Sequence, residues 1–333
     1  MKAYRLVASG ADGLQRRDEP APTPGAGEVL LRLKAASVNY RDIAILAGVY
    51  PNKQGVIPLS DGAGVVEAVG HGVHGFTPGD AAVSCFYADW QAGPATAANH
   101  SVSLGCERDG MLAEYVCLPA TALVAKPATL DFAEAATLPC AALTAWSALF
   151  TEGNLRPGQH VLVQGTGGVA TFALQFARMA GAEITVISGS EAKLERAREM
   201  GANHLVNYRE TTDWASRVME ITGGAGVDVV VELGGADTLE QSLRCVAVGG
   251  HISVIGVLSG LEAHISLRHM LFRHIRLCGI TVGHREDFIA MNRAIDLHGI
   301  SPVIDTRFGF DEAALAYAAL PRGLHFGKLV IES

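Results

Sequence analysis

The residues whose spacing points most directly to chemistry are the glycines of the run VQGTGGVA. Gly165, Thr166, Gly167, Gly168 and Val169 fit the pattern G-x-G-x-x-A. In this pattern the first glycine permits a tight turn, the second lets the backbone approach a pyrophosphate, and the small last residue lets a helix pack on a strand. Free N–H groups at the start of that helix attract phosphate. The run therefore predicts a dinucleotide-binding turn.

A second group of polar residues would select the nucleotide. Domains that bind NAD place an acidic residue after the second strand, where it holds the ribose 2′-hydroxyl. The corresponding strand, EITVIS, ends without one, and Ser188, Ser190 and Lys193 surround the place of a 2′-phosphate, together with Tyr208, the last residue of VNY. We therefore expect NADP(H) as the cofactor. Two alternatives stay open: Glu191 favours NAD, and Ser190 could simply cap a helix while Lys193 faces solvent.

A strand and a helix must position these glycines. The apolar run VLV precedes them, and Val169, Phe172, Ala173 and Phe176 then recur at helical spacing. Farther along, the runs ITVIS, HLVNY, DVVVEL, HISVIGV and RLCGITVG alternate with helical stretches. Strands that alternate with helices predict an α/β fold with a doubly wound parallel sheet. We assign residues 123–283 to this dinucleotide-binding Rossmann domain.

The rest of the chain has a different pattern. A length of 333 residues predicts two domains. Residues 1–122 carry short β-type runs, such as EVLLRLKAASV and GAGVVEAVG, between turn residues. A helix is predicted over 286–297, and the ending GKLVIE is typical of a strand that returns to the first domain. We assign residues 1–122 and 284–333 to a β-rich catalytic, substrate-binding domain.

Composition restricts the possible partners. The chain has 26 basic and 34 acidic residues, a formal charge of −8, and 49% hydrophobic residues. The sequence has no basic stripe, so neither nucleic acid nor an anionic membrane is an expected partner. We expect a small-molecule substrate instead. The start, MKAYRLVASGADG, lacks the apolar segment of a signal peptide, and the cysteines form no C-x-x-C pair. We expect a cytoplasmic protein with reduced thiols.

Several stretches together resemble one family. The β-rich start, the segment AATLPCAALTAWSAL, the turn VLVQGTGGVA, the phrase GHISVIGV and the ending FGKLVI are similar to the medium-chain dehydrogenase/reductase superfamily. The motifs NYRD (39–42) and SDGAG (60–64) resemble its zinc-free, quinone-oxidoreductase-like branch. The resemblance implies a twisted-barrel, GroES-like catalytic domain completed by the C-terminus. It also implies that the Rossmann domain is inserted into it and that the active site lies in the cleft between them.

The departures from the family pattern concern zinc. Zinc-dependent members hold the catalytic metal with a cysteine where this chain has Asn39, a histidine where it has Ser60, and a third ligand at Cys140. One thiolate cannot hold Zn²⁺, which has three protein ligands in catalytic sites. The structural zinc site needs four closely spaced cysteines, and only Cys106 lies between Cys85 and Cys117. We therefore expect no metal.

Without a Lewis acid, removal of an alcohol proton during hydride transfer is difficult, so reduction is the expected direction. Hydride could add to a quinone or an α,β-unsaturated carbonyl, which leaves an oxyanion that needs only hydrogen-bond donors. Candidate catalytic donors are Asn39, Tyr40 and Tyr50, which by resemblance face the cleft. The structural alternative is that the tyrosines are half-buried core residues. An alcohol or aldehyde dehydrogenase, and a protein that binds NADPH without catalysis, remain alternative functions.

The resemblance adds two cofactor contacts and an assembly. Thr144, four residues after Cys140, matches the position that backs the nicotinamide ring, and Gly256 lies in the phrase GHISVIGV. The last strands of the Rossmann sheet are apolar, and in the family they pair across a two-fold axis. We therefore expect a homodimer, because a partner commonly covers an open apolar sheet edge.

Overall fold

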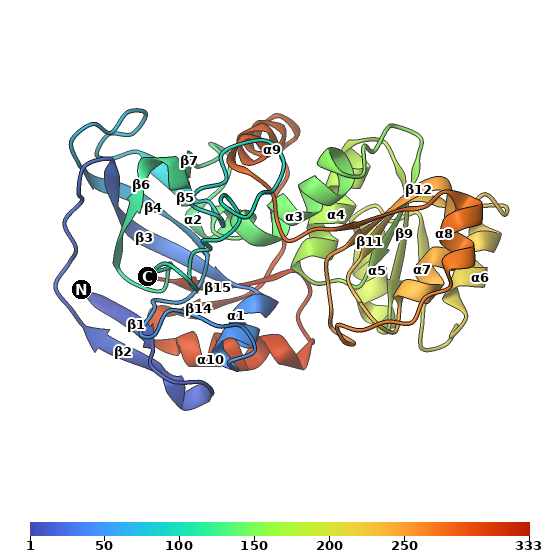
Figure 1. The fold of residues 1–333 in the computed structure, drawn as a ribbon, viewed down its shortest axis with the longest axis horizontal. Coiled ribbons are helices and arrows are strands. Elements are labelled where there is room, and N and C mark those ends of the chain that lie inside the picture. Colours follow the sequence, from blue (N-terminus) through green and yellow to red (C-terminus); the bar gives the residue numbers. More distant parts are fainter. The chain divides into compact units, whose positions relative to one another are not determined.

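The computed structural model describes the backbone of residues 1–333 and every side chain except that of residue 11. It divides into two compact units. Unit 1 comprises Met1–Leu143 and His284–Ser333, and unit 2 comprises Thr144–Gly283. The chain therefore leaves unit 1 once and returns to it at the position that the sequence predicts. Figure 1 labels the elements of both units.

The N-terminal boundary differs from the predicted one. We expected the Rossmann domain to begin at residue 123, whereas unit 2 begins at Thr144. The reason is pairing: strand β7 (Leu123–Ala125) bonds to strand β5 (Ala81–Ser84) of unit 1. The backbone N–H groups of residues 128 and 129 also donate to the carboxylate of Asp296, which returns with the C-terminal segment. The segment 123–143 is thus an integral part of unit 1.

The main sheet of unit 1 has the order β14-β15-β3-β4-β5-β7, and β6 also pairs with β3. The long strand β3 alternates buried and half-buried residues, as expected for a strand with one face on the core. β15 pairs antiparallel with β3 and parallel with β14, so the C-terminus completes the N-terminal sheet (Figure 1). The strands of unit 1 are β1 (Lys2–Leu6), β2 (Leu14–Asp18), β3 (Glu28–Val38), β4 (Asp61–Val69), β5, β6 (Tyr115–Pro119), β7, β14 (Ile304–Gly309) and β15 (Lys328–Glu332).

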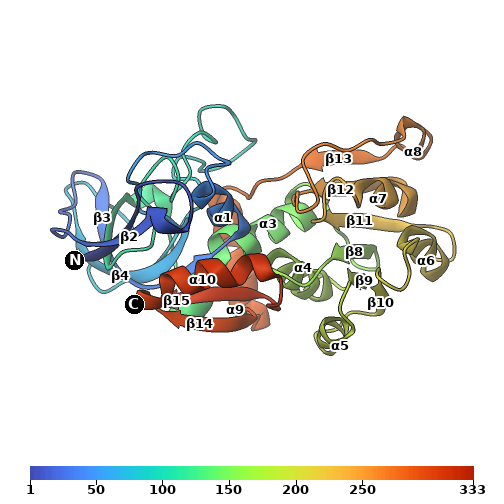
Figure 2. The same cartoon turned by 90° about the horizontal axis from the view of Figure 1, so that it is seen from below.

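Helices close this sheet at several points. Helix α10 packs on β14 and β15, where Ala313, Ala316 and Tyr317 join the apolar core with Leu329 and Ile331. Figure 2 shows α10 alongside these two strands. The helices of unit 1 are α1 (Tyr40–Leu46), α2 (Phe132–Ala135), α9 (Arg285–His298) and α10 (Ala313–Ala319), with short turns at Ala11–Gly13, Ala120–Ala122, Phe310–Glu312 and Leu320–Arg322. A wider helical turn, Leu138–Ala142, ends the first part of the unit.

Unit 2 is a parallel sheet with the order β10-β9-β8-β11-β12-β13. This arrangement is the doubly wound Rossmann sheet that the sequence predicts. The runs that form it are apolar because both faces of a parallel sheet are covered. Its strands are β8 (His160–Gln164), β9 (Glu183–Ser188), β10 (His204–Asn207), β11 (Val227–Glu232), β12 (Val246–Val254) and β13 (Arg276–Gly279).

The helices of unit 2 lie on both faces of the sheet, with α4 and α5 on one side and α7 on the other (Figure 2). On the α7 face, Trp214, Leu243, Leu162, Val230 and Ile252 share one apolar core. The helices are α3 (Leu143–Trp146), which starts at the boundary, α4 (Gly168–Met179), α5 (Glu191–Glu199), α6 (Trp214–Ile221), α7 (Leu239–Cys245) and α8 (Leu267–Arg273), with a wider turn at Ser147–Thr151. Among the residues that were searched, no helix is long and apolar enough to cross a membrane.

Candidate functional site

The glycine turn of unit 2 has the geometry that a phosphate-binding loop requires. Gly165 has φ +76°, a left-handed conformation that favours glycine, and its N–H bonds to the carbonyl of Ile187 at 2.7 Å. α4 then begins at Gly168, with Gly167 as its N-cap. No side chain caps this end. The first N–H groups of α4 are therefore not taken up by a capping side chain, which suits an anionic ligand.

A buried carboxylate fixes the neighbouring strand ends. Glu232, the last residue of β11, is fully buried and accepts hydrogen bonds from Gln164 Nε2 (2.6 Å), Thr238 Oγ1 (2.5 Å) and Ser242 Oγ. The backbone N–H groups of residues 234 and 235 add two more bonds, of 3.0 and 3.1 Å. Sequence reasoning missed this residue. The available signal was an acid at the end of the apolar run DVVVE.

Gly256 marks a close approach of two backbones at the same edge. A Cβ at this position would lie 1.9 Å from the carbonyl oxygen of Leu233, so no side chain fits. Its N–H also bonds to the carbonyl of Glu232 at 3.1 Å. Gly256 therefore lets the end of β12 approach the loop after β11, at the carboxyl edge where open α/β sheets bind ligands.

The residues expected around a 2′-phosphate gather at the end of β9. Ser188 is buried there, Ser190 is the N-cap of α5 and forms no capping bond with its side chain, and Lys193 is half-buried in the first turn. A Cβ on Gly189 would lie 2.8 Å from both Tyr208 Oη and Arg209 Nε. Both side chains therefore lie over Gly189.

Arg209 is the member of this group that sequence reasoning missed. Its guanidinium adds a second positive charge to that of Lys193. The signal was a basic residue directly after VNY. Glu191, the residue that favours NAD, accepts a hydrogen bond from Asn207 Nδ2 at 3.2 Å. The carboxylate that would bind a ribose 2′-hydroxyl thus already has a partner.

Thr144 is buried at the start of unit 2. Its hydroxyl donates to the carbonyl of Thr281 at 3.1 Å, which joins the two ends of the unit. This contact gives Thr144 a structural role within unit 2. The nicotinamide contact remains a proposal.

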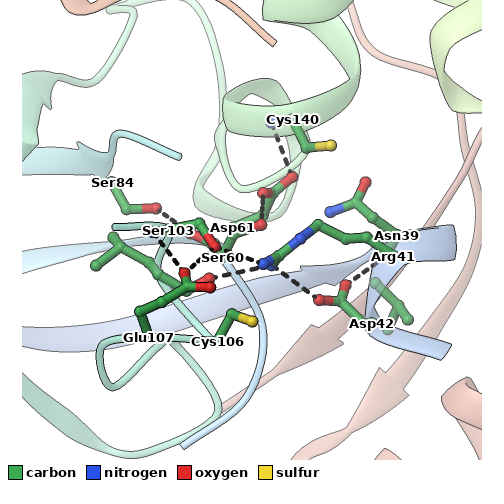
Figure 3. Close-up of polar contacts among 12 residues, drawn as sticks. Asn39, Arg41, Asp42, Ser60, Asp61, Ser84, Ser103, Cys106, Glu107 and Cys140 are labelled. Atoms are coloured by element: carbon green, nitrogen blue, oxygen red, sulfur yellow. Dashed lines mark hydrogen bonds and ion pairs between the residues drawn. The ribbon is translucent and has the colours of Figure 1, made fainter. Parts of the chain in front are cut away.

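Asn39, Ser60 and Cys140, which the family resemblance matches to zinc ligands, lie in a hydrogen-bonded cluster in unit 1 (Figure 3). Ser60 and Asp61 are fully buried, and Ser60 Oγ donates to Asp61 Oδ1 at 2.6 Å. The backbone N–H of Cys140 donates to Asp61 Oδ2 at 3.2 Å. Asn39 is the N-cap of α1, and its backbone N–H donates to Asp42 Oδ2 at 2.8 Å. Most polar atoms of this cluster are thus hydrogen-bonded to other atoms of the cluster.

A lysine from the far end of the chain enters this cluster. Lys328 is the first residue of β15 and is buried. Its ammonium donates to the carbonyl of Val38 at 2.9 Å and to Asn39 Oδ1 at 2.5 Å. Sequence reasoning missed Lys328 as a site residue, although a lysine in the apolar ending FGKLVI was the available signal.

The charges of the cluster are closely coupled. Burial raises the pKa of Asp61 above its usual range, and Lys328, Ser60, Asn39 and Cys140 act against this increase. Burial likewise raises the pKa of Asp42 to about 6, against the effect of Arg41. The pKa of the Cys140 thiol is also raised, first by burial and then by the Asp61 carboxylate.

These residues do not fit a zinc ion. Asn39 offers an amide whose oxygen is bound to Lys328, and Ser60 offers a hydroxyl bound to Asp61, so only Cys140 is a usual zinc ligand. Among the side chains that the structure describes, no group of three His, Cys, Asp or Glu residues could hold a metal. The buried ammonium of Lys328 also places a positive charge beside Asn39.

The expected catalytic donors differ in their accessibility. Asn39 is buried, its oxygen is held by Lys328, and its Nδ2 meets no hydrogen-bond partner among the described residues while it faces Asp61. This placement gives Asn39 a structural role, and its role as a donor to substrate stays a prediction. Tyr40, the first residue of α1, is 51% exposed, and Tyr50 is 41% exposed. Both phenols could donate to a ligand.

The aromatic excursion after β5 packs against itself. Phe86 lies 4.6 Å beneath the guanidinium of Arg41, and Trp90 contacts the rings of Tyr87 and His284. Arg41 also donates to the Leu104 carbonyl at 3.0 Å. Arg41 thus holds this loop to α1, and Phe86 and Trp90 each pack on Tyr87 within it.

Comparisons with known proteins cover both units. Residues 25–128 match the alcohol dehydrogenase GroES-like domain, and residues 168–296 match the zinc-binding dehydrogenase family. A zinc-type alcohol dehydrogenase-like protein of Schizosaccharomyces pombe is 45% identical, over 97% of this chain and 96% of that protein. The quinone oxidoreductase of Rattus norvegicus is 29% identical, over 95% and 93%.

Among solved structures, a candidate alcohol dehydrogenase from Sinorhizobium meliloti has a TM-score of 0.95 with this chain. The two are 44% identical, and the match covers 100% of this chain and 98% of the other. The similarity therefore extends over both units and over the connection between them.

Proposed function

We propose, from the premise that this chain belongs to the medium-chain dehydrogenase/reductase superfamily of oxidoreductases, that it uses NADPH without zinc. Its proposed substrates are quinones or α,β-unsaturated carbonyl compounds. The single observation that carries this proposal is that Asn39, Ser60 and Cys140, which the family resemblance matches to zinc ligands, are hydrogen-bonded to Asp61 and Lys328 in a buried cluster. Without a Lewis acid at these positions, the chain lacks the usual means to remove an alcohol proton.

The cofactor assignment is supported by the residues of unit 2. The proposed contacts to the pyrophosphate are the glycine turn and the first N–H groups of α4. The proposed contacts to the 2′-phosphate are Ser190, Lys193, Tyr208 and Arg209, since two basic and two hydroxyl-bearing residues lie at the end of β9 and beside Gly189. We also propose that Gly256, just after β12, and Ser188, at the end of β9, line the cofactor site.

Bound NADPH would supply a hydride from its nicotinamide. The chain must then stabilise the oxyanion that hydride addition creates on the substrate. We assign this role to the phenol of Tyr40, because it is exposed and, among the described residues, its hydroxyl has no hydrogen-bond partner. A phenol can donate a hydrogen bond without any change of its own charge. Tyr50 is the second candidate, by the same criterion.

The rat quinone oxidoreductase supports the quinone half of the proposal, because its similarity extends through most of this chain. The alcohol dehydrogenase-like relatives support the alternative, an alcohol or aldehyde dehydrogenase. A screen of NADPH oxidation with quinones, enals and saturated aldehydes separates the two, before and after exhaustive chelation with EDTA. We expect turnover of quinones or enals that chelation does not change. Activity confined to saturated aldehydes, or lost on chelation, would favour the alternative.

The assembly is a further part of the proposal. β13 is the end strand of the unit 2 sheet, and the adjacent α8 exposes Leu267, Leu271 and Phe272. An open strand beside exposed apolar side chains is an association hazard that a second copy can cover. We therefore propose a homodimer formed through this edge.

A further inference from the structure

Lys328 contacts two consecutive residues of the turn that ends in Tyr40. Its ammonium donates to the carbonyl of Val38, the last residue of β3, and to the side chain of Asn39, the N-cap of α1. Tyr40 follows directly and is the first residue of the helix. A single side chain from β15 therefore bonds to both residues of the turn that connects β3 to α1.

Other contacts fix the turn and the lysine. On the helix side, the backbone N–H of Asn39 donates to Asp42, which is almost fully buried. On the strand side, Gly327 has φ +90°, and a Cβ there would lie 2.3 Å from the carbonyl of Val303. This close approach lets β15 start where the Lys328 N–H reaches Val303, at 2.8 Å. The ammonium is thus delivered to one location and has little freedom to leave it.

Burial of Lys328 must have a compensating partner. The side chain is 3% exposed, and an unpaired ammonium at such a position is strongly destabilising. The carboxylates of Asp61 and Asp42 supply negative charge close enough to interact with it. A neutral side chain of similar shape could fill the same space more simply. A charged side chain at this position is explained if its charge-assisted hydrogen bonds serve to position the β3–α1 turn.

We propose that Lys328 is a positioning residue, which acts through the β3–α1 turn to hold the phenol of Tyr40 where it can donate to the substrate oxygen. The inference rests on the proposed function, in which Tyr40 is the donor. It assigns no contact between Lys328 and the substrate. Displacement of a catalytic group by about 1 Å can reduce turnover by roughly a hundredfold, so precise support of this turn matters.

A double-mutant cycle tests the proposal. Lys328→Met and Tyr40→Phe are made singly and together, and kcat is measured with the best enal or quinone from the screen. We expect each single variant to lose about tenfold or more in kcat, with little change in the dissociation constant of NADPH. Because Lys328 acts through Tyr40, Lys328→Met should cost almost nothing further in the Tyr40→Phe background. Multiplicative losses would overturn the inference and leave the proposed function intact.

Two further variants protect the cycle from a folding defect. The cycle is repeated in an Asp61→Asn background, where Lys328→Met no longer leaves the Asp61 carboxylate without its lysine, and it must give the same coupling. Lys126→Met is the matched control, because Lys126 also donates to backbone carbonyls of unit 1, those of Pro127 and Leu130, away from the turn. It should change stability alone. An equal loss of kcat in Lys126→Met would contradict a specific role for Lys328.

An NMR measurement that needs no substrate turnover tests the role of Lys328 independently of the proposed reaction. Fluorotyrosine is incorporated, and the ¹⁹F resonance of Tyr40 is assigned from the Tyr40→Phe variant. We expect one narrow Tyr40 resonance in the parent chain and a shifted or broadened one in Lys328→Met, while the other tyrosine resonances stay in place. An unchanged Tyr40 resonance would refute the positioning role. If the parent chain reduces none of the substrates, the proposed function fails, and the ¹⁹F result still decides whether Lys328 holds Tyr40.

Discussion

Gln164 and Glu232 join the carboxyl ends of two adjacent strands, with Nε2 of the amide 2.6 Å from the carboxylate of Glu232. The Gln164 oxygen accepts from the backbone N–H groups of residues 233 and 234, at 3.1 and 3.0 Å. One side chain therefore fixes β8, β11 and the loop after β11. The same strand end leads into the glycine turn.

Replacement of Gln164 by leucine should damage both stability and cofactor binding. It removes a donor to a buried charge and leaves the backbone N–H of residue 233 unpaired, so the free energy of unfolding should fall by roughly 2 to 4 kcal/mol. The dissociation constant of NADPH should rise. Chemical denaturation and calorimetric titration measure the two effects. Gln241→Leu is the control, because Gln241 bonds to the backbone at residues 212 and 215, away from the glycine turn. Equal effects of the two variants would contradict the special role of Gln164.

The affinity for NADPH, through its 2′-phosphate, should depend on Arg209. Loss of one charge-assisted contact costs about 1.5 to 3 kcal/mol, so Arg209→Ala should weaken NADPH binding about tenfold or more. NADH lacks the 2′-phosphate, and its affinity should stay unchanged. Calorimetric titration of the parent chain should show NADPH binding at least tenfold tighter than NADH. Arg217→Ala, which removes an exposed arginine paired with Glu220, is the control. Equal loss of both cofactors in Arg209→Ala would argue against a 2′-phosphate contact.

The stability of unit 2 should depend on pH through His160. Burial lowers the pKa of His160 below its ordinary 6.5, with a smaller effect of His204 in the same direction, against Glu183 and Asp228. The folded chain therefore keeps this ring neutral while the unfolded chain takes up a proton. Its contribution to stability is complete above about pH 7 and is lost as the pH falls through 6.5. The pKa of His251 is lowered in the same way, whereas Asp42, with a pKa of about 6, acts in the opposite direction below that pH.

Thermal unfolding at pH 7.5 and at pH 5.5 isolates the His160 contribution. His160→Gln should lose less stability between the two values than the parent chain does, because it has no proton to gain. His71→Gln, which changes an exposed histidine of unit 1, should behave like the parent. An acid-induced loss in His160→Gln that equals that of the parent would refute the assignment.

Light scattering should detect the proposed dimer. At micromolar concentration the mass should be about twice 34.9 kDa. Phe272→Glu introduces a charge into the exposed apolar surface of α8, where Phe272 is 77% exposed, and should shift the mass toward the monomer. Leu297→Glu changes an equally exposed residue, 80%, on α9 of unit 1 and should leave the dimer intact. A parent chain that is already monomeric would mean that the edge needs no partner.

The sequence predicted the elements whose causes are local. The glycine turn, the alternation of strands and helices, and the final strand on the first domain all follow from periodicity and from a motif shorter than ten residues. The Rossmann and GroES-like architecture was confirmed by the strand order and by the comparisons. The first boundary was wrong, because the pairing of β7 with β5 depends on a strand about 40 residues earlier, which periodicity does not show.

The site residues that the sequence did not predict owe their positions to contacts with residues far away in the chain. Lys328 and Asn39 are separated by 289 positions, so no spacing rule brings them together. Glu232 meets Gln164 across 68 positions, through the register of a parallel sheet. Arg209 lies over Gly189 because a glycine leaves space for it. The contact that holds the Asn39 side chain comes from β15, which the sequence around Asn39 does not show.

The destination of the hydride tests the central claim most directly. The chain is treated with EDTA and incubated with an enal and NADPH deuterated at C4 on either face, and mass spectrometry then locates the deuterium in the product. The account predicts deuterium on the β-carbon of a saturated aldehyde, from NADPH deuterated on one face only, at an undiminished rate after chelation. Deuterium on the carbonyl carbon of an alcohol product, or turnover that requires added zinc, would contradict it.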